Sequence, residues 1–402
     1  MSADVRSGGD PPARTPVGAS LSLAELARDP FPTLALLRER EPVSWIAADC
    51  VWLITSHALV DEAHRDQSRF VTDLETSEVR QLFGTTMLTV DGPAHRRHHA
   101  PFAAPLRRAA AEEAYPAVIR QLAERQLADL GGQSAELVGE FARPLAQRLV
   151  AAVLGFDASD GEALEQLVAD MAAADGITVG EEVRRRAART RESFGARVLE
   201  ALREAERQPS GGVLAAVART RSGELTDRQI VDNMINMIFG AVDPTAILIA
   251  TALWALLAHP DQLAMVRDDR TLLPLAVREA ARWHPPFAAS VRYVGLDTEF
   301  HGTPMGAGEK VYLMIMSANR DEQVFRDPEV YDIGRSELRL SLAFGRGLHF
   351  CVGEALAEIA AREAIDAALT ALPGLRLDPA RAVEPRGVDH HQLERLDVLY
   401  GT

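Results

Sequence analysis

Cys351 is the side chain of this sequence with the clearest potential for chemistry. It lies near the end of the run FGRGLHFCVG, residues 344–353, and a helical pattern follows over residues 354–364. Unpaired N–H groups and the positive end of the helix dipole favour a thiolate over a thiol at such a position. Gly345 and Gly347 allow the preceding loop to turn tightly and to lie against a flat ligand. A thiolate on such a loop can bind haem iron and push electron density toward it, whereas a structural role is more common for a single cysteine.

The whole run matches the pattern FxxGxxxCxG and resembles the cysteine-ligand loop of the cytochrome P450 family, with every fixed position present. The resemblance implies that Cys351 binds the iron of heme b, and that Phe344, Gly345 and Gly353 lie beside this cofactor. It also implies the cytochrome P450 fold, which is mainly α with a small β-rich lobe, as a single domain over residues 21–402. The implied activity is that of a haem-thiolate monooxygenase, which incorporates oxygen from O2 into a small-molecule substrate.

A long helix is predicted to cross the core and to carry the oxygen-binding side of the site. Thr226 and Gln229 have the spacing of a capping box, and apolar residues continue to about Leu257 before His259-Pro260 ends the pattern. Because the pattern is apolar nearly all round, we expect the helix to be buried. Its stretch Gly240-Ala241-Val242-Asp243-Pro244-Thr245 is similar to the family's A-G-x-D/E-T pattern, which implies that Gly240 and Ala241 lie against the porphyrin.

Pro244 is the main departure from the family pattern. It occupies the position at which the family usually has an oxygen-activating threonine, and it has neither a hydroxyl nor a backbone N–H. A kink is expected there, because the proline ring clashes with the carbonyl group of Gly240. Thr245 is one candidate to replace the threonine, although one residue along a helix turns a side chain by about 100°. Asp243 is a candidate proton relay, unless it points away from the iron and pairs with a cation.

Glu279 and Arg282 match the family's E-x-x-R motif. Residues three apart share one helix face, and a buried charged pair must be fully hydrogen-bonded. The resemblance implies that this pair braces the cysteine loop. Family members often complete the network with an arginine in a later P-x-R-F motif, but Val330 stands at that position here. We therefore expect another donor, such as a backbone group, to complete it.

Two buried haem propionates need cationic or hydrogen-bonding partners. The resemblance assigns this role to His95, Arg292 and His349, and to His99, which stands where the family usually has arginine. Because the charge of a histidine depends on pH, His99 would make propionate binding pH-dependent. An alternative zinc site of His95, His98 and His99 lacks a fourth ligand nearby.

The substrate pocket is expected to be largely apolar. Matching family positions would line it with Met87, Leu88, Val242, Phe287, Ala288 and Val291. A pocket with small residues at its centre suits a terpenoid, a polyketide, an aromatic amino acid or a carrier-bound acyl group. The resemblance therefore implies a bacterial enzyme of secondary metabolism and leaves its substrate open.

The composition excludes several classes of partner and indicates where the protein acts. The chain has 402 residues, 47% of them hydrophobic, and a net charge of −15, which argues against nucleic acid and anionic membranes as partners. No apolar run of about 18 residues is evident and no signal peptide pattern is present, so we expect a monomeric cytoplasmic protein with no membrane span. Residues 1–20, rich in Pro, Gly, Ser and Arg, are expected to form a disordered lead-in. Cys50, in an apolar run, is expected to be a small core residue.

Short strands are expected within residues 42–55, 291–294, 310–316 and 393–400, with mostly helical sequence over 62–280.

The sequence shows neither a nucleotide-binding GxGxxG turn nor a cysteine cluster, so electrons are expected from a separate ferredoxin and ferredoxin reductase. Two other functions stay open. One is an atypical haem enzyme that uses peroxide or performs coupling, rearrangement or dehydration, as Pro244 suggests. The other is a haem-binding sensor, for which no output domain is apparent.

Overall fold

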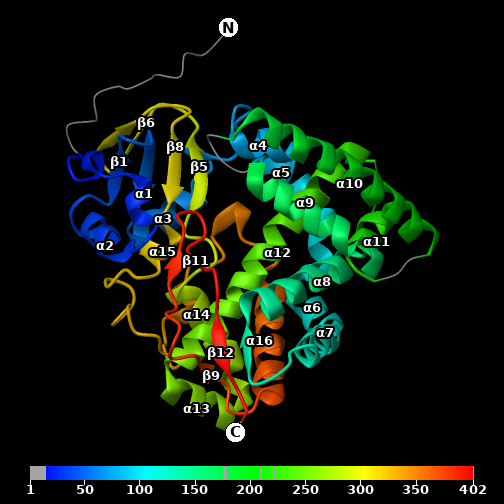
Figure 1. Ribbon diagram of the computed structural model, residues 1–402. Coiled ribbons are helices and arrows are strands. Elements are labelled where there is room, and N and C mark those ends of the chain that lie inside the picture. Colours follow the sequence, from blue (N-terminus) through cyan, green and yellow to red (C-terminus); the bar gives the residue numbers. More distant parts are fainter. Residues whose placement is uncertain (1–14, 175–178, 209–210, 221–222, 402) are drawn as a thin grey trace.

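The computed structural model describes residues 15–174, 179–208, 211–220 and 223–401, and it is mainly helical (Figure 1). Its α-helices are α1 (Leu23–Leu26), α2 (Phe31–Arg40), α3 (His57–Arg65), α4 (Glu78–Phe83), α5 (Gly92–Ala103), α6 (Arg108–Ala114), α7 (Pro116–Ala128), α8 (Arg143–Leu154), α9 (Gly161–Ala174), α10 (Glu181–Arg207), α11 (Val213–Arg219), α12 (Asp227–Ala258), α13 (Pro260–Asp268), α14 (Leu273–Trp283), α15 (Ile315–Ala318) and α16 (Glu354–Ala371). The predicted mainly α fold is confirmed.

The largest sheet has the strand order β1-β2-β8-β5-β3, in which β2 and β8 are parallel and the other neighbours antiparallel. The strands are β1 (Val43–Ile46), β2 (Val51–Ile54), β3 (Phe70–Val71), β4 (Ser134–Glu136), β5 (Ser290–Val294), β6 (Thr298–Phe300), β7 (Thr303–Met305), β8 (Lys310–Leu313), β9 (Arg376–Leu377), β10 (Pro385–Arg386), β11 (Gln392–Leu393) and β12 (Asp397–Leu399). Each predicted strand region contains observed strands. The strand expected over 310–316 is shorter, because α15 begins directly after it.

The predicted long helix is α12, of 32 residues, and Thr226 caps it as expected. The Thr226 hydroxyl accepts from the Gln229 N–H at 3.2 Å, and the Gln229 side chain accepts from the Thr226 N–H at 3.0 Å. Among the described helices, α12 is long and apolar enough to cross a membrane, contrary to the expectation that no such segment exists. However, 72% of its most apolar window is buried inside the protein, which is typical of the core helix of a globular protein.

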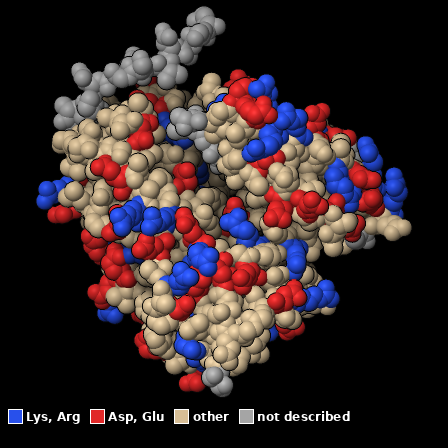
Figure 2. Space-filling view, in the orientation of Figure 1, with Lys and Arg blue, Asp and Glu red and all other residues tan. Residues whose placement is uncertain are grey.

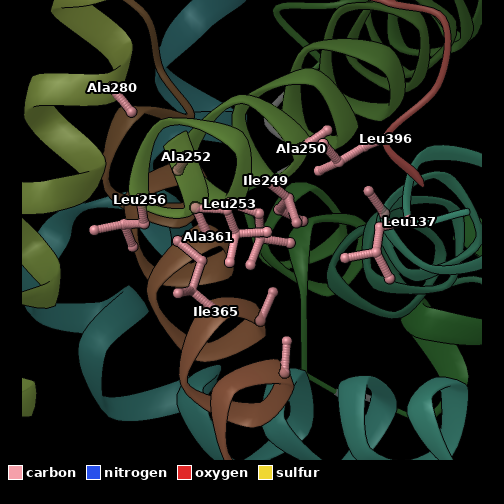
Figure 3. Packing of buried hydrophobic residues seen from close by; sticks show 14 of the residues in the cluster. Leu137, Ile249, Ala250, Ala252, Leu253, Leu256, Ala280, Ala361, Ile365 and Leu396 are labelled. Carbon is pink, nitrogen blue, oxygen red and sulfur yellow. The ribbon is translucent and has the colours of Figure 1, made fainter. Parts of the chain in front are cut away.

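The second half of α12 forms the centre of the largest apolar cluster. Figure 3 shows Ile249, Leu253 and Leu256 of α12 packed near Ala361 and Ile365 of α16. α16 begins shortly after Cys351. Its packing against α12 therefore fixes the position of the cysteine loop relative to α12, the helix that is predicted to lie on the other side of the site. Burial of such side chains contributes roughly 1.5–3 kcal/mol each relative to exposure.

For the N-terminal region, the expected end of the lead-in at residue 20 is too late, and the expected burial of Cys50 is wrong. The lead-in expected up to residue 20 is folded from Thr15 onward, because the Glu41 carboxylate accepts from the N–H groups of Val17 at 2.9 Å and Gly18 at 3.0 Å. The rest of that segment lies outside the described residues. Cys50 is exposed and not in the core, because it occupies the turn between β1 and β2 with a φ of 54°.

Candidate haem site

The loop before Cys351 is closed by its own backbone. The Cys351 N–H donates to the Phe344 carbonyl at 3.0 Å, and the Gly345 N–H donates to the Leu342 carbonyl at 2.8 Å. Gly345 and Gly347 both have a φ of 70°, a conformation that L side chains rarely adopt. A 3₁₀ turn over Gly347–His349 then leads the chain to the start of α16. The glycines therefore let the loop present Cys351 on its inner side.

Gly347 is also required by its neighbour. A Cβ atom at this position would lie 2.5 Å from the backbone oxygen of His64, at the end of α3. His64 is itself buried, and its ring nitrogens contact the Val60 carbonyl at 2.8 Å and the Ser290 hydroxyl at 3.2 Å. This histidine therefore supports the loop from behind, a role that sequence reasoning missed because nothing in the local sequence marks it.

Cys351 is accessible and at the same time closely surrounded by protein. This burial raises the pKa of the thiol to about 11. Hydrogen bonds from the Gly353 and Glu354 backbones act in the opposite direction and are outweighed. The expectation of a thiolate from the helix N-terminus alone is therefore wrong for the protein without its cofactor. Binding of a cation at the sulfur would have to release the proton.

The residues expected on the oxygen-binding side lie on α12. Gly240 is exposed, and no atom lies within 4 Å of the position of an added Cβ. α12 continues without a break through Pro244, whose missing N–H cannot donate to the Gly240 carbonyl. Ala241 is half-buried, and Thr245 is 8% exposed. Open space beside Gly240 is what a flat ligand against this helix requires.

Asp243 pairs with a cation. Its Oδ1 lies 3.4 Å from Nη1 of Arg143, the first residue of α8, and the two side chains are 23% and 45% exposed. The same Oδ1 has no hydrogen-bond partner among the described residues, so the contact is a loose ion pair. This arrangement matches the alternative in which the carboxylate pairs with a cation.

Arg292 is a buried cation that forms no ion pair with the described residues. It is 5% exposed and donates to the adjacent Val291 carbonyl at 2.8 Å. Burial lowers the pKa of Arg292 to about 10, although the charge of Asp91 opposes this effect. A buried guanidinium with so few acceptors is suited to an anionic ligand.

Three histidines lie together, and one of them, His349, is close enough to Arg292 for the arginine charge to lower its pKa. The His95 and His99 rings stack with centroids 5.2 Å apart, and His349 meets His95 edge-on at 4.7 Å. His95 Nδ1 is buried without a partner among the described residues, whereas His349 Nε2 contacts an Asp91 carboxylate oxygen at 2.8 Å. Within the described part of the chain, no group of three His, Cys, Asp or Glu side chains could hold a metal ion, so the alternative zinc site is not formed.

These residues fit a haem. The accessible sulfur of Cys351 would hold the iron, the open face at Gly240 leaves room for the ring, and Arg292 with the unpartnered His95 nitrogen can receive propionates. Phe344 and Gly353 flank the cysteine in the chain, and Gly353 would place a Cβ 3.9 Å from the Cys351 sulfur. The site therefore defines a haem-thiolate class of protein.

Glu279 and Arg282 form a fully buried pair on α14. Arg282 donates to both carboxylate oxygens of Glu279 at 2.7 Å, and its remaining N–H groups reach the backbone carbonyls of Asn319 (2.9 Å), Pro328 (2.8 Å) and Val330 (3.1 Å). All five guanidinium donors are thus used, which a buried charge requires.

Arg335 completes this network, and sequence reasoning missed it. Its Nε donates to Glu279 at 3.1 Å, and its side chain is 4% exposed. The expected backbone donor is present as well, since the Asp332 N–H reaches Glu279 at 3.0 Å. Arg335 lies five residues beyond Val330, so the position expected for the arginine was too early in the chain.

The predicted pocket residues fall into two groups. Leu88 is 41% exposed and Phe287 36% exposed, and Val291 is half-buried. Val242 and Ala288 have no accessible surface and pack in apolar clusters, so in this structure neither offers a side chain to a ligand, contrary to the prediction. Met87 is 6% exposed and belongs to the same cluster as Val242.

Known proteins are similar to this chain in sequence and in fold. The family model for cytochrome P450 matches residues 181–369. The C-19 steroid 1alpha-hydroxylase of Sorangium cellulosum is 31% identical, covering 85% of this chain and 86% of the relative. Nocardicin C N-oxygenase of Nocardia uniformis subsp. tsuyamanensis is 31% identical, covering 91% and 93%. The structure of P450BioI with an acyl carrier protein ligated to hexadec-9Z-enoic acid superposes with a TM-score of 0.85 at 26% identity, covering 95% of this chain and 100% of that one.

The chain therefore belongs to the cytochrome P450 family. It is a haem-containing monooxygenase, an oxidoreductase whose curated relatives include enzymes of bacterial secondary metabolism.

Proposed function

We propose that this enzyme oxidises a small, largely apolar organic molecule of bacterial secondary metabolism in the cytoplasm, with electrons from a separate ferredoxin and its reductase. The observation that carries the proposal is the accessible Cys351 sulfur in the loop closed by Phe344, together with the open face of α12 at Gly240. When bound, the haem would supply an iron that binds O2 and directs one oxygen atom into the substrate.

The chain's own residues would hold and shield this cofactor. The sulfur of Cys351 would bind from one side, and the backbone bonds of its loop keep the sulfur in place. Arg292 and His95 would bind the propionates, while Asp91 orients His349. Against the effect of burial, the hydrogen bonds from His349 and from backbone N–H groups lower the pKa of Asp91 to about 2, so this carboxylate stays charged at neutral pH.

The first test of the proposal is spectroscopic. The reduced carbonyl complex of the purified protein should show the long-wavelength Soret band of thiolate ligation. Cys351→Ser should lose this band. Cys50→Ser is the matched control, because Cys50 is the other free cysteine of the described chain, and it should keep the band. The reverse pattern would remove the haem assignment to Cys351.

A basic group of side chains supports docking of an acidic ferredoxin. Arg107 and Arg108 are exposed just before and at the start of α6, and Arg108 contacts Glu354, the first residue of α16, at 2.8 Å. Arg108 also contacts Glu358 at 2.8 Å, so its charge is compensated. Arg107 has no ion pair among the described residues and therefore places positive charge near the helix that begins at the cysteine loop, on a chain whose net charge is −15. Arg107→Glu should slow reduction by ferredoxin, and the slowing should shrink at high salt. Equal rates at low salt would contradict this docking surface.

An atypical reaction is the second candidate, and Pro244 favours it. A positioned proton donor typically contributes roughly 10²–10⁴-fold to rate, and Pro244 has none, while Asp243 pairs with Arg143. With surrogate apolar substrates we expect the wild type to consume reductant and release mostly hydrogen peroxide. Pro244→Thr should shift electrons toward oxygenated product. Efficient product formation by the wild type that Thr245→Ala abolishes would show that Thr245 serves as the donor group and that the enzyme is an ordinary monooxygenase.

A further inference from the structure

A small cavity lies between α4, α9 and α10, and none of its lining residues belongs to the haem site. Its volume is about 250 Å³. Arg184 and Arg191 of α10 line it, together with Glu78 of α4 and an apolar wall that includes Leu82, Met171 and Ala187. One side of the cavity is therefore charged and the other is apolar, which suits an amphipathic ligand.

Arg191 is incompletely satisfied within the protein. Its Nη2 donates to the Asp232 carboxylate of α12 at 2.6 Å and to the Phe83 carbonyl of α4 at 2.9 Å. Its Nε has no hydrogen-bond partner among the described residues but is too deeply buried for a ligand to reach, whereas its Nη1 makes no hydrogen bond to the described residues and is not buried in this way. The side chain is 15% exposed. A mostly buried guanidinium with an unused donor in a cavity wall is a receptor for an additional acceptor.

The local charge balance favours an anion. Arg191 and Arg228 share the single carboxylate of Asp232, at 2.6 Å and 2.9 Å. One carboxylate thus faces two guanidinium groups, which leaves an excess of positive charge at this contact. Arg184 adds a further positive charge, and it is exposed. The group around the cavity therefore carries more guanidinium than carboxylate.

Glu78 is the one carboxylate that lines the cavity from the described residues, and it has its own partners. Its Oε2 accepts from the Tyr293 hydroxyl at 3.0 Å and lies 3.3 Å from the Lys310 ammonium. Burial opposes ionisation, but Lys310 and Tyr293 hold the pKa of Glu78 below its ordinary value. Since Lys310 balances this charge, Glu78 does not cancel the excess of the arginines.

The outer surface adds to this excess through Arg184. Figure 2 shows Lys and Arg side chains gathered over the first half of α10. Arg185, Arg186 and Arg189 of this helix are exposed, but each is ion-paired, Arg185 and Arg189 with Glu182 and Arg186 with Asp170. Arg184 has no ion pair among the described residues and lines the cavity, so its positive charge is the one left for an anionic ligand.

We propose that this cavity binds a short amphipathic carboxylate, with its acidic group on Arg184 and Arg191 and its apolar chain against Leu82, Met171 and Ala187. The volume of about 250 Å³ is slightly below the range of typical small-molecule pockets, which starts at roughly 300 Å³, and this limits the ligand to a short chain. The site is separate from the haem chemistry of the proposed function. The acid is either the end of a longer substrate or a separate small molecule, and both have the same recognition chemistry.

The test is calorimetric titration of the haem-loaded full chain with sodium octanoate and with octanamide, which differ in charge and not in chain length. The wild type should bind octanoate at least ten-fold more tightly. Arg184→Gln should weaken octanoate binding by about ten-fold, as expected for loss of a charge-assisted contact, and leave octanamide binding unchanged. A Soret shift at saturation would identify the acid as reaching the haem, and its absence would identify a separate ligand.

Arg185→Gln is the matched control. Arg185 is 60% exposed on the same helix, pairs with Glu182 at 3.2 Å and does not line the cavity, so this variant should bind both probes like the wild type. Equal binding of octanoate and octanamide by the wild type, or an unchanged preference in Arg184→Gln, would overturn the proposal. The carbonyl spectrum of each variant is read separately, so failure of the haem assignment and failure of this site are distinguishable.

Discussion

Loss of Arg335 should destabilise the protein less than loss of Arg282, although both guanidinium groups bind the same carboxylate. Arg282→Ala removes both 2.7 Å bonds to Glu279, which is 0% exposed, and leaves a buried charge with Arg335 and a backbone N–H. Removing one partner of a buried pair typically costs about 3–5 kcal/mol.

Arg335→Ala removes one charge-assisted bond to Glu279 at 3.1 Å, and bonds to the carbonyls of Arg326, Asp327 and Val330. The carboxylate keeps its bidentate partner, and the Val330 carbonyl keeps a bond from Arg282 at 3.1 Å. We therefore expect a loss of about 1.5–3 kcal/mol, the range for hydrogen bonds of a charged group.

The effect of Arg282 should reach the cysteine loop. Arg282 donates to the Asn319 carbonyl at 2.9 Å, and the Asn319 side-chain oxygen accepts from the Leu342 N–H at 2.7 Å. The Leu342 carbonyl in turn accepts from Gly345 at 2.8 Å. Haem content should therefore fall further in Arg282→Ala than in Arg335→Ala.

The assay is urea unfolding of the haem-loaded protein, followed by far-UV circular dichroism and by Soret absorbance. Arg326→Ala is the control, because its side chain is 89% exposed and contacts Asp327 at 3.9 Å, and it should change stability by less than about 0.5 kcal/mol. The reasoning is refuted if Arg335→Ala is as mild as this control, or if it is more destabilising than Arg282→Ala.

Three further predictions concern single residues. Burial, Arg107 and His349 lower the pKa of His99, so this side chain becomes charged only at a pH below its ordinary pKa near 6.5. Haem retention should therefore rise as the pH falls below about 6.5, and in His99→Arg haem retention should not depend on pH. Burial lowers the pKa of His64 to about 3, so below about pH 6.5 the unfolded state binds a proton that the folded state does not. The free energy of unfolding should therefore fall by up to about 1.4 kcal/mol per pH unit from about pH 6.5 downward. Denaturation at several pH values should show a smaller slope in His64→Gln. Gly347→Ala should reduce haem content and stability more than Gly308→Ala. Both glycines have a positive φ, but an added Cβ at Gly347 would meet the His64 carbonyl, whereas an added Cβ at Gly308 would meet open space. Equal losses of stability in thermal unfolding would contradict the clash.

The elements of the fold that could be predicted are those marked by local pattern. The α12 capping box is set by residues three apart, and the cysteine loop by ten consecutive residues. Arg335 was missed because it meets Glu279 from 56 positions away, and no short motif encodes that contact. His64 contacts Gly347 across a much larger gap in sequence. Contacts of this kind depend on tertiary packing, which periodicity does not report.

Burial was the other quantity that the sequence could not supply. Cys50 sits in an apolar run but takes the turn position, so it is exposed, whereas Val242 follows the small residues of α12 but faces the core. A one-residue change of position along a helix rotates a side chain by about 100°, and in a hairpin turn the direction depends on φ. The motif position therefore identifies the segment and leaves the direction of each side chain to the packing.

The two sides of the haem site differ in how firmly the protein holds them. On the cysteine side, every donor of Arg282 is used, and the loop is closed by backbone bonds from Gly345 and Cys351. On the α12 side, Pro244 lacks a donor, and one oxygen of Asp243 has no hydrogen bond among the described residues. The cysteine side thus rests on a dense network of hydrogen bonds, while proton delivery on the α12 side would rest on few polar groups. A substrate that brings its own polar group to the oxygen site would compensate for this lack, and for that reason the Pro244→Thr experiment bears on the reaction type and not on haem binding.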